Sequence, residues 1–351
     1  MKTEYIERPD LSSDEGKRAI DRAGEIIRGG GLVVFPTETV FGLGGNALDP
    51  EAAAKIYQAK GRPSDNPLII HICAPDEAAR YTETTELYNR LAKRFMPGPL
   101  TVVLPAKPII PKTVTANLPT VAVRCPSHPT AHALIAAAGV PIAAPSANLS
   151  GSPSPTTFAH VKEDLDGRVD MILGGECEIG VESTIVRLDS PDSLTLLRPG
   201  GITPEQLGEF ARLELSDAVL NKLKEGETVQ SPGMKYKHYA PKTPLYLLRG
   251  DRAARERFLA KQSGRFAVFA VLAYTEEIEK LRSHPSSPVV FDLGSALDPA
   301  QQLHRLFYLL READKAGCER IYAALPATEG LSLALYNRMI RAAAYQIVSA
   351  D

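Results

Sequence analysis

The feature of this sequence that most limits its fold is the regular alternation of short apolar segments with segments of helical periodicity. Residues 14–29 repeat alanine and isoleucine at helical spacing, and the glycines that follow favour a helix end there. The next segment, LVVF at 32–35, is typical of a buried strand. Asp49 and Pro50 are an N-cap and a first-turn proline for a helix over 51–59. This alternation predicts a mixed α/β layer architecture, with helices covering a sheet.

The same alternation continues along the rest of the chain. In the first part, further strands are predicted at 68–72, 101–104, 121–124, 141–145, 171–173 and 184–188, and helices near 84–95, 128–138 and 155–164. In the second part, strands are predicted at 245–249, 266–272, 288–291 and 320–325, and helices at 251–262, 298–317 and 331–348. The second series predicts a smaller parallel, Rossmann-like α/β domain. It carries no G-x-G-x-x-G loop, so no motif there indicates nucleotide binding.

The division of the chain follows from its length and its turn residues. A length of 351 residues suggests roughly two domains at ~100–200 residues each. Residues 211–244 lack a long apolar run and are interrupted by prolines and glycine, with Pro232 and Pro241 among them. We therefore predict a mixed-sheet domain over 1–210, a linker over 211–244 and a Rossmann-like domain over 245–351.

Composition excludes several classes of protein. Lys and Arg number 40 against 42 Asp and Glu, so the net charge of −2 lacks the basic excess of a dedicated nucleic-acid binder. No apolar stretch approaches the ~20 residues that span a bilayer, and the N-terminal residues MKTEYIERPD form no signal peptide. Cys73, Cys125, Cys177 and Cys318 lie far apart, which disfavours both a zinc site and a disulfide framework. We expect a cytoplasmic protein that does not enter a membrane.

Two polar motifs in the first part contain candidate binding residues. PTETVFGLGG at 36–45 follows a predicted strand, where α/β sheets hold ligands, although an ordinary strand-to-loop turn is an equal alternative. AKGRPSDNPLIIH at 59–71 carries Lys60 and Arg62 at a helix end. Such a pair suits a polyphosphate, but two cations there could also complement the helix dipole. A lone histidine such as His71, at the end of an apolar strand, is more often structural than catalytic.

Three further motifs place polar groups next to apolar strands. Arg124 closes the strand VAVR, where a buried guanidinium needs an anion from either a protein carboxylate or a ligand. Ser146 and Asn148 in APSAN follow an apolar run, and either a ligand contact or an Asx or Ser turn would explain them. Arg198 in LLRPGG is either a phosphate or base contact or a solvated turn residue.

Together these motifs supply cations and hydroxyls from several strand ends. The sequence has no Cys-His pair, no G-x-S-x-G elbow and no Walker lysine loop. This set favours the binding of an anionic nucleotide and a small polar acid, with catalysis by positioning and charge stabilisation.

The chain resembles the YrdC-type L-threonylcarbamoyladenylate synthase family. The resemblance rests on PTETVFGLG, the Lys60-x-Arg62 pair with SDNPL, APSAN, GVESTIV and LLRPG, in that order. The segment SPGMKYKHYAP is similar to the connector of the family's long two-domain form, so nearly the whole chain is covered. Phe41 stands where the family often carries tyrosine. The resemblance implies a YrdC-like mixed-sheet catalytic domain, a lid-forming linker and a Rossmann-like accessory domain.

The resemblance also implies an activity. The protein would be a nucleotidyltransferase that converts L-threonine, bicarbonate or CO2, and ATP into L-threonylcarbamoyl-AMP and pyrophosphate. Downstream tRNA threonylcarbamoyl transferase proteins would use this product to modify the adenosine beside the anticodon, and a weak contact with tRNA itself is left open. Mg2+ is expected with ATP, held mostly by substrate oxygens and water and not by a dedicated protein metal site.

Residue roles follow from the same resemblance. Lys60 and Arg62 would be catalytic. The ATP site would consist of Lys60, Arg62, Ser64, Thr120, Ser146, Asn148, Arg198, Ser231, Tyr236 and Tyr239. The L-threonine site would consist of Thr37, His71, Arg124, Ser183 and Thr184, with Arg124 on the carboxylate. The linker residues among these, together with Lys235 and His238, would either close over the site as a lid or form a solvated hinge.

Two other functions fit parts of the sequence. One is a non-catalytic RNA-binding or ribosome-associated module, against which the net charge of −2 counts. The other is a carbamoyl transferase that uses carbamoyl phosphate. Such enzymes resemble the first domain but carry zinc-finger and acylphosphatase modules, and four scattered cysteines cannot form the fingers.

Overall fold

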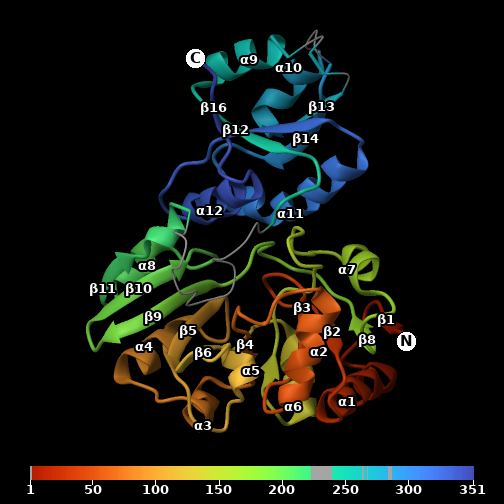
Figure 1. Cartoon of the computed structure of the whole chain (residues 1–351), viewed down its shortest axis with the longest axis vertical. Helices are drawn as coiled ribbons and strands as arrows, with labels where there is room; N and C mark the ends of the chain where they lie inside the picture. Colours follow the sequence, from red (N-terminus) through yellow and green to blue (C-terminus); the bar gives the residue numbers. More distant parts are fainter. Residues whose placement is uncertain (1, 223–238, 263–264, 267, 284–286) are drawn as a thin grey trace. The chain divides into compact units, whose positions relative to one another are not determined.

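Helices and strands alternate along the chain as expected, and they gather into two units (Figure 1). The structure, a computed structural model, describes residues 2–222, 239–262, 265–266, 268–283 and 287–351. Within this range, the first unit comprises residues 2–150 and 154–222, and the second comprises 151–153 and the described residues from 239 onward. No helix in these ranges is both long and apolar enough to cross a membrane.

A large mixed sheet forms the frame of the first unit. Across it, the described strands lie in the order β1 (Glu4–Ile6), β8 (Met171–Leu173), β2 (Val33–Phe35), β3 (Gly42–Asn46), β7 (Ile142–Ala143), β4 (Ile69–His71), β6 (Thr120–Arg124), β5 (Leu100–Pro105), β9 (Thr184–Ser190), β10 (Ser193–Arg198) and β11 (Arg212–Leu215). The pairs β1/β8, β8/β2, β4/β6, β5/β9 and β10/β11 are parallel, and the other pairs are antiparallel. The predicted mixed α/β architecture is confirmed.

Helices cover this sheet and are capped by the residues that the sequence favours. They are α1 (Asp14–Arg28), α2 (Pro50–Lys60), α3 (Ala78–Tyr81), α4 (Glu86–Phe95), α5 (Lys112–Thr115), α6 (Pro129–Ala138), α7 (Phe158–Leu165) and α8 (Pro204–Gly208), with short 3-10 turns η1 (Pro75–Glu77) and η2 (Asp217–Val219). The Asp49 side chain accepts from Glu51 N at the start of α2, and Gly61 ends this helix with a left-handed φ of 60°. Ile27 of α1 and Leu134 of α6 are buried in one core cluster with Phe35.

Two strands lie where the sequence predicts a loop and a linker. β3 occupies the glycine-rich motif, and a Cβ on Gly44 would lie 2.7 Å from Ile142 and 2.8 Å from Phe35, so glycine is needed for this close packing. β11 pairs in parallel with β10, and Ala218 of η2 is buried in a core cluster. Residues 211–219 therefore belong to the first unit and not to a linker.

The second unit is built on a parallel sheet, which confirms the predicted Rossmann-like arrangement. Its described strands lie in the order β14 (Val289–Gly294), β13 (Phe269–Tyr274), β15 (Arg320–Ala324), β12 (Leu245–Arg249) and β16 (Ile347–Ser349). Helices lie on both faces of the sheet (Figure 1). One face carries α9 (Arg252–Ala260) and α10 (Ile278–Arg282), preceded by the turn η3 (Thr275–Glu277), and the other carries α11 (Pro299–Lys315) and α12 (Ser332–Ala342).

The end of the chain differs from the prediction of a helix over 331–348. α12 stops at Ala342, and Ala344 and Tyr345 have positive φ values of 47° and 65° that turn the chain. β16 then pairs with β12. The sequence has no glycine or proline at this turn, so nothing in it marks the helix end.

Candidate active site

Hydrogen bonds join the polar motifs of the first unit, although they lie far apart in the sequence. The backbone nitrogen of Ala147 donates to the oxygen of Phe41 at 2.8 Å, so APSAN lies beside PTETVFGLG. Gly180 N donates to Thr39 O at 3.1 Å and attaches GVESTIV to the same segment. These three motifs therefore form one continuous polar region.

Lys60 connects α2 to this region. Its side chain is buried, and Nζ donates to the backbone oxygens of Ser146 and Asn148, the latter at 2.7 Å. Asn148 Oδ1 lies 3.4 Å from the same nitrogen. Burial, and secondarily the charge of Arg62, lowers the pKa of Lys60 well below its ordinary value, while Asp164 and nearby Glu182 act in the opposite direction.

The turn after α2 carries the other predicted phosphate ligands. Arg62 Nη2 donates to Asn66 O at 3.0 Å, and the Tyr57 hydroxyl donates to the same oxygen at 2.9 Å. Ser64 is exposed. The Asn66 side chain is fully buried, and within the described residues neither of its amide atoms has a hydrogen-bond partner. Lys60 and Arg62 thus leave the same helix end, one bonded to APSAN and the other to its own turn.

Ser146 and Asn148 make local hydrogen bonds. Ser146 Oγ donates to Asn148 Oδ1 at 2.5 Å, and Asn148 Nδ2 donates to Leu149 O at 2.8 Å. Bonds of this kind stabilise an Asx or Ser turn, which was one of the two interpretations of APSAN. A role in binding ATP stays a prediction for both residues.

Arg124 meets a carboxylate of its own chain. Its Nη2 lies 2.8 Å from Glu38 Oε1, and both side chains are about 5% exposed. The strands β3, β7 and β4 separate β2 from β6 in the sheet, so the segment that follows β2 reaches past them to bring Glu38 to Arg124. The anion that a buried Arg124 requires is therefore present as Glu38.

His71 is the neighbour of Arg124 across parallel strands β4 and β6. It is buried, and its Nδ1 lies 3.3 Å from Ile142 O. Burial, and secondarily the charge of Arg124, lowers the pKa of His71 to about 3, so the ring is neutral at pH 7. Because a carbonyl can only accept, the proton belongs on Nδ1, which leaves Nε2 as a hydrogen-bond acceptor.

Two predicted threonine-site residues have hydroxyls engaged with nearby backbone. The Thr37 hydroxyl donates to Val40 O at 2.6 Å. The Thr184 hydroxyl donates to Ile202 O at 2.8 Å and accepts from Ile202 N at 2.9 Å. Both residues are buried, and these bonds fix the ends of the PTETV and GVEST segments.

Ser183 links two further strands. Its hydroxyl shares a 2.7 Å hydrogen bond with that of Thr101 on β5, which is the cross-strand partner of Arg124. Arg198, at the end of β10, donates from Nε and Nη2 to Ser183 O at 3.1 and 3.0 Å. Arg198 is 6% exposed, so the solvated-turn interpretation of this residue is wrong.

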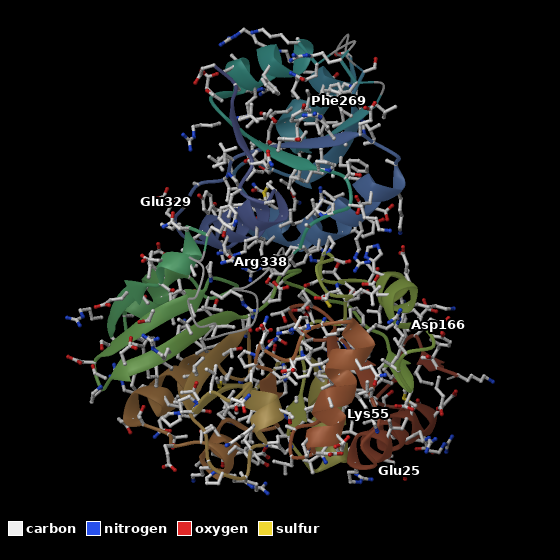
Figure 2. All side chains as sticks on the ribbon, in the orientation of Figure 1. Glu25, Lys55, Asp166, Phe269, Glu329 and Arg338 are labelled. Atoms are coloured by element: carbon white, nitrogen blue, oxygen red, sulfur yellow. The ribbon has the colours of Figure 1, made fainter. Side chains whose placement is uncertain are left out.

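The other predicted ATP-site residues are Thr120, Tyr239, Ser231 and Tyr236. Thr120 begins β6 and Arg124 ends it, so they lie at opposite ends of one strand. Tyr239 is buried in the second unit, with its ring 5.2 Å from that of Phe307 and the guanidinium of Arg338 5.3 Å from its centre (Figure 2 labels Arg338). Ser231 and Tyr236 lie outside the described residues, as do Lys235 and His238.

Two buried carboxylates were given no role by the sequence argument. Glu38 pairs with Arg124, and Glu182 accepts from the Ser154 hydroxyl at 2.5 Å. Both lie within motifs that the sequence singles out, but their partners are distant along the chain. Among the described residues, no group of three or more His, Cys, Asp or Glu is arranged to hold a metal ion.

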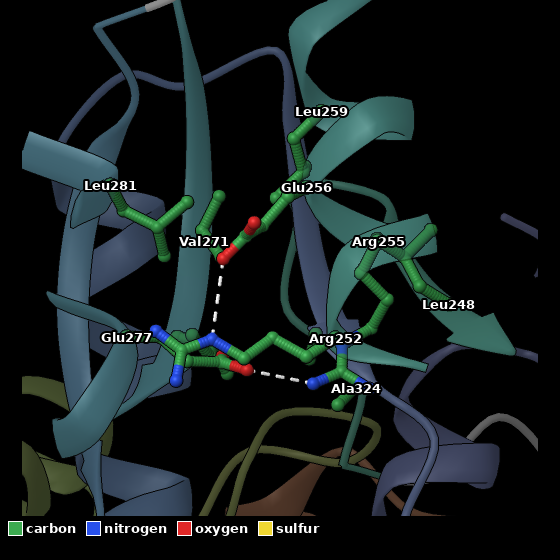
Figure 3. A pocket seen from close by; sticks show the side chains of 11 residues that line it. Leu248, Arg252, Arg255, Glu256, Leu259, Val271, Glu277, Leu281 and Ala324 are labelled. Atoms are coloured by element: carbon green, nitrogen blue, oxygen red, sulfur yellow. Dashed lines mark hydrogen bonds and ion pairs between the residues drawn. The ribbon is translucent and has the colours of Figure 1, made fainter. Parts of the chain in front are cut away.

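The second unit contains a small cavity lined by α9, α10 and three strands of the parallel sheet (Figure 3). Its volume of about 20 Å³ admits one water-sized molecule. Arg252 pairs with Glu256 at 3.2 Å, and Arg255 pairs with Glu277 at 2.7 Å. The charges around this cavity thus pair with one another, and the candidate active site is the network of the first unit.

Comparison with known proteins points to one family of enzymes. Residues 25–200 match the family model described as "Telomere recombination", and residues 202–344 match the one described as "Threonylcarbamoyl-AMP synthase, C-terminal domain". The threonylcarbamoyl-AMP synthase of Pyrococcus abyssi is 43% identical over 334 residues, which cover 93% of this chain and 94% of the relative. The enzyme of that name from Bacillus subtilis is 43% identical over 334 residues, or 94% of each chain.

A solved structure agrees with these matches. It is P. abyssi Sua5 complexed with L-threonine, which has a TM-score of 0.88 and 41% sequence identity and covers 99% of both chains. The relatives are enzymes by name, so the alternative of a non-catalytic RNA-binding module is not retained. The chain therefore belongs to the threonylcarbamoyl-AMP synthase family.

Proposed function

We propose that this chain is a threonylcarbamoyl-AMP synthase, which converts L-threonine, bicarbonate or CO2, and ATP into L-threonylcarbamoyl-AMP and pyrophosphate. The observation that carries the proposal is the 43% identity, over nearly the full length, to relatives of that name. Downstream tRNA threonylcarbamoyl transferase proteins would consume the product in the cytoplasm, where free cysteines stay reduced. A weak direct contact with tRNA stays a prediction, which titration with tRNA at two salt concentrations would test.

The nucleotide would bind beside the end of α2. Two donors of the Lys60 ammonium are bonded to backbone oxygens, and the third, 3.4 Å from Asn148 Oδ1, would turn to a phosphate oxygen. The planar fork of Arg62 would hold a second phosphate oxygen and stabilise the charge that develops on phosphorus. The remaining proposed ATP contacts are Ser64, Thr120, Ser146, Asn148, Arg198, Ser231, Tyr236 and Tyr239.

The amino acid would bind where β4 and β6 end. Arg124 would take the carboxylate through its Nε–Nη2 edge, which suits a bidentate carboxylate. The unprotonated Nε2 of His71 would accept a hydrogen bond from the threonine hydroxyl. Thr37, Ser183 and Thr184 would line the pocket.

Mg2+ would enter with ATP as part of the substrate. Among the described residues, no cluster of three or more His, Cys, Asp or Glu is arranged as a metal cage. Phosphate oxygens and water would therefore be its main ligands.

The chemistry would then depend mainly on positioning. The threonine nitrogen, once deprotonated, adds to CO2 to form a carbamate. A carbamate oxygen attacks the α-phosphorus of ATP and the bond to pyrophosphate breaks, which gives the mixed anhydride. The protein would align the two substrates, stabilise the negative charge on the leaving pyrophosphate and exclude water.

Pyrophosphate release from ATP by the purified protein tests this proposal. Release should require both L-threonine and bicarbonate, and mass spectrometry should detect threonylcarbamoyl-AMP. Absence of release with all three substrates would contradict the proposal. Release with a different amino acid, but not with threonine, would retain the chemistry and change the substrate.

A further inference from the structure

The ion pair of Glu38 and Arg124 is held in place but incompletely hydrogen-bonded. The backbone oxygen of Glu38 accepts from Ile179 N at 2.8 Å, which anchors the residue that carries the carboxylate. Arg124 is the last residue of β6, and the pairing of this strand with β4 and β5 holds its backbone in place. Nη2 and Oε1 lie 2.8 Å apart, yet within the described residues neither atom makes a hydrogen bond of good geometry.

Other polar atoms of the Arg124 and Glu38 side chains also lack hydrogen-bond partners within the described residues. Arg124 Nε and the second carboxylate oxygen of Glu38 also have no hydrogen-bond partner among the described residues. Buried polar atoms are normally satisfied, and exceptions call for an explanation such as a ligand. Here a guanidinium edge and a carboxylate lie side by side, each with capacity for another partner.

The charges nearby match one kind of molecule. The His71 ring is neutral at pH 7, so Arg124 and Glu38 provide one positive and one negative charge. An α-amino acid carries its carboxylate and ammonium on the same carbon atom and has no net charge. If Arg124 holds its carboxylate, the amino group on the neighbouring carbon atom comes within reach of Glu38.

We propose that Glu38 receives the amino group of the substrate L-threonine while Arg124 holds its carboxylate, so that Glu38 selects α-amino acids over 2-hydroxy acids. This inference rests on the proposed function and assigns a specificity-determining residue to its substrate site. Glu38 also sets the direction in which the nitrogen points when it is carbamoylated.

Other buried carboxylates of the first unit are engaged elsewhere. Glu182 accepts from Ser154, and Asp164 accepts from Leu149 N at 3.2 Å. Of the three carboxylates Glu38, Glu182 and Asp164, Glu38 is the one paired with Arg124, whose guanidinium is proposed to bind the substrate carboxylate. The side chain that meets the amino group is therefore Glu38.

The test compares two ligands in two variants. The ligands are L-threonine and 2,3-dihydroxybutanoate of the same stereochemistry, in which a hydroxyl replaces the amino group. In Glu38→Gln, the Kd for L-threonine, measured by calorimetry, should rise about 10- to 100-fold, as expected for the loss of a charge-assisted hydrogen bond. The Kd for the hydroxy acid should change less than about 3-fold, because that ligand has no ammonium to lose.

A matched control removes a carboxylate outside this site. Glu77 accepts a hydrogen bond from Cys73 N and is half-buried, so Glu77→Gln should leave the ratio of the two dissociation constants as in the wild type. An equal loss of affinity for both ligands in Glu38→Gln would mean that Glu38 has only a structural role, and would overturn the inference. The wild-type protein gives a second test that needs no variant, since equal affinity for both ligands would also overturn it.

These outcomes are separate from the failure of the proposed function. Failure of the wild-type protein to form threonylcarbamoyl-AMP would contradict the synthase activity. A wild-type protein that forms the product, with an unchanged ligand preference in Glu38→Gln, would contradict only the role of Glu38.

Discussion

The ammonium nitrogen of Lys60 lies 2.7 Å from the backbone oxygen of Asn148, so one buried cation attaches the end of α2 to the APSAN segment. The same nitrogen bonds the oxygen of Ser146. A lysine in the last turn of a helix usually extends into solvent, where it complements the helix dipole. Lys60 points inward instead and organises the loop that carries two of the proposed nucleotide contacts.

Replacement of Lys60 by methionine should abolish synthesis and lower stability. The change removes a proposed phosphate ligand and leaves two buried backbone oxygens without their donor. We expect a loss of at least about 100-fold in pyrophosphate release, and about 1–3 kcal/mol in the free energy of unfolding. Lys55→Met is the control, because Lys55 lies on the same helix and also bonds a backbone oxygen, that of Gly30. Wild-type turnover in the Lys60→Met protein would show that Lys60 is not needed for synthesis.

His71 should make the protein sensitive to acid. Its pKa is about 3 in the folded state against an ordinary value of 6.5, so between these values the unfolded chain binds a proton that the folded protein does not. The free energy of unfolding must then fall as pH falls through this window, by up to ~1.4 kcal/mol per pH unit. Urea unfolding at pH 4 to 7 should show a smaller decline for His71→Gln than for the wild type. The exposed His304 provides the control, and equal slopes for His71→Gln and the wild type would contradict the prediction.

Gly200 should tolerate no side chain. A Cβ there would lie 2.5 Å from Glu182 O and closer still to Thr184 N, so the LLRPGG turn would be pushed away from GVEST. We expect Gly200→Ala to cost about 1–3 kcal/mol in the free energy of unfolding, and to reduce synthesis because Ser183 lies in the displaced segment. Gly208→Ala should be neutral or slightly stabilising, since nothing lies within 4 Å of the added atom and alanine favours the helix. Equal stabilities of the two variants would show that the turn adapts.

Removal of Mg2+ should stop synthesis without weakening the fold. The described residues form no metal-binding group, so the ion would be needed only by the ATP phosphates. Excess EDTA should bring pyrophosphate release to background, excess Mg2+ should restore it, and the Tm without ATP should not change. A lower Tm in EDTA would indicate a metal held by the protein itself.

Most elements of the fold could be predicted because their signals are local. The N-cap at Asp49 and the first-turn Pro50 begin α2 as the sequence indicates. β3 could not be predicted, because its glycines have low strand propensity and the strand exists through packing against Phe35 and Ile142. β16 likewise depends on pairing with β12, which no local pattern shows.

Part of the candidate site could be predicted, because residue types at strand ends are also a local signal. The types of residue at strand ends indicated anion binding, and the need of Arg124 for an anion followed from its apolar strand. Which carboxylate meets that need could not be predicted, because β3, β7 and β4 separate β2 from β6 in the sheet. The inward direction of Lys60 also depends on a loop far along the chain.

The strand β11 has a consequence for any attempt to isolate the first domain. It covers the outer edge of β10, and η2 adds Ala218 to the core beneath. A fragment that stops at residue 210 would leave the backbone groups of β10 open to pairing with other molecules and would be prone to aggregate. A fragment that continues to residue 222 keeps the edge of β10 paired, so residues 211–222 should determine whether the isolated first unit aggregates.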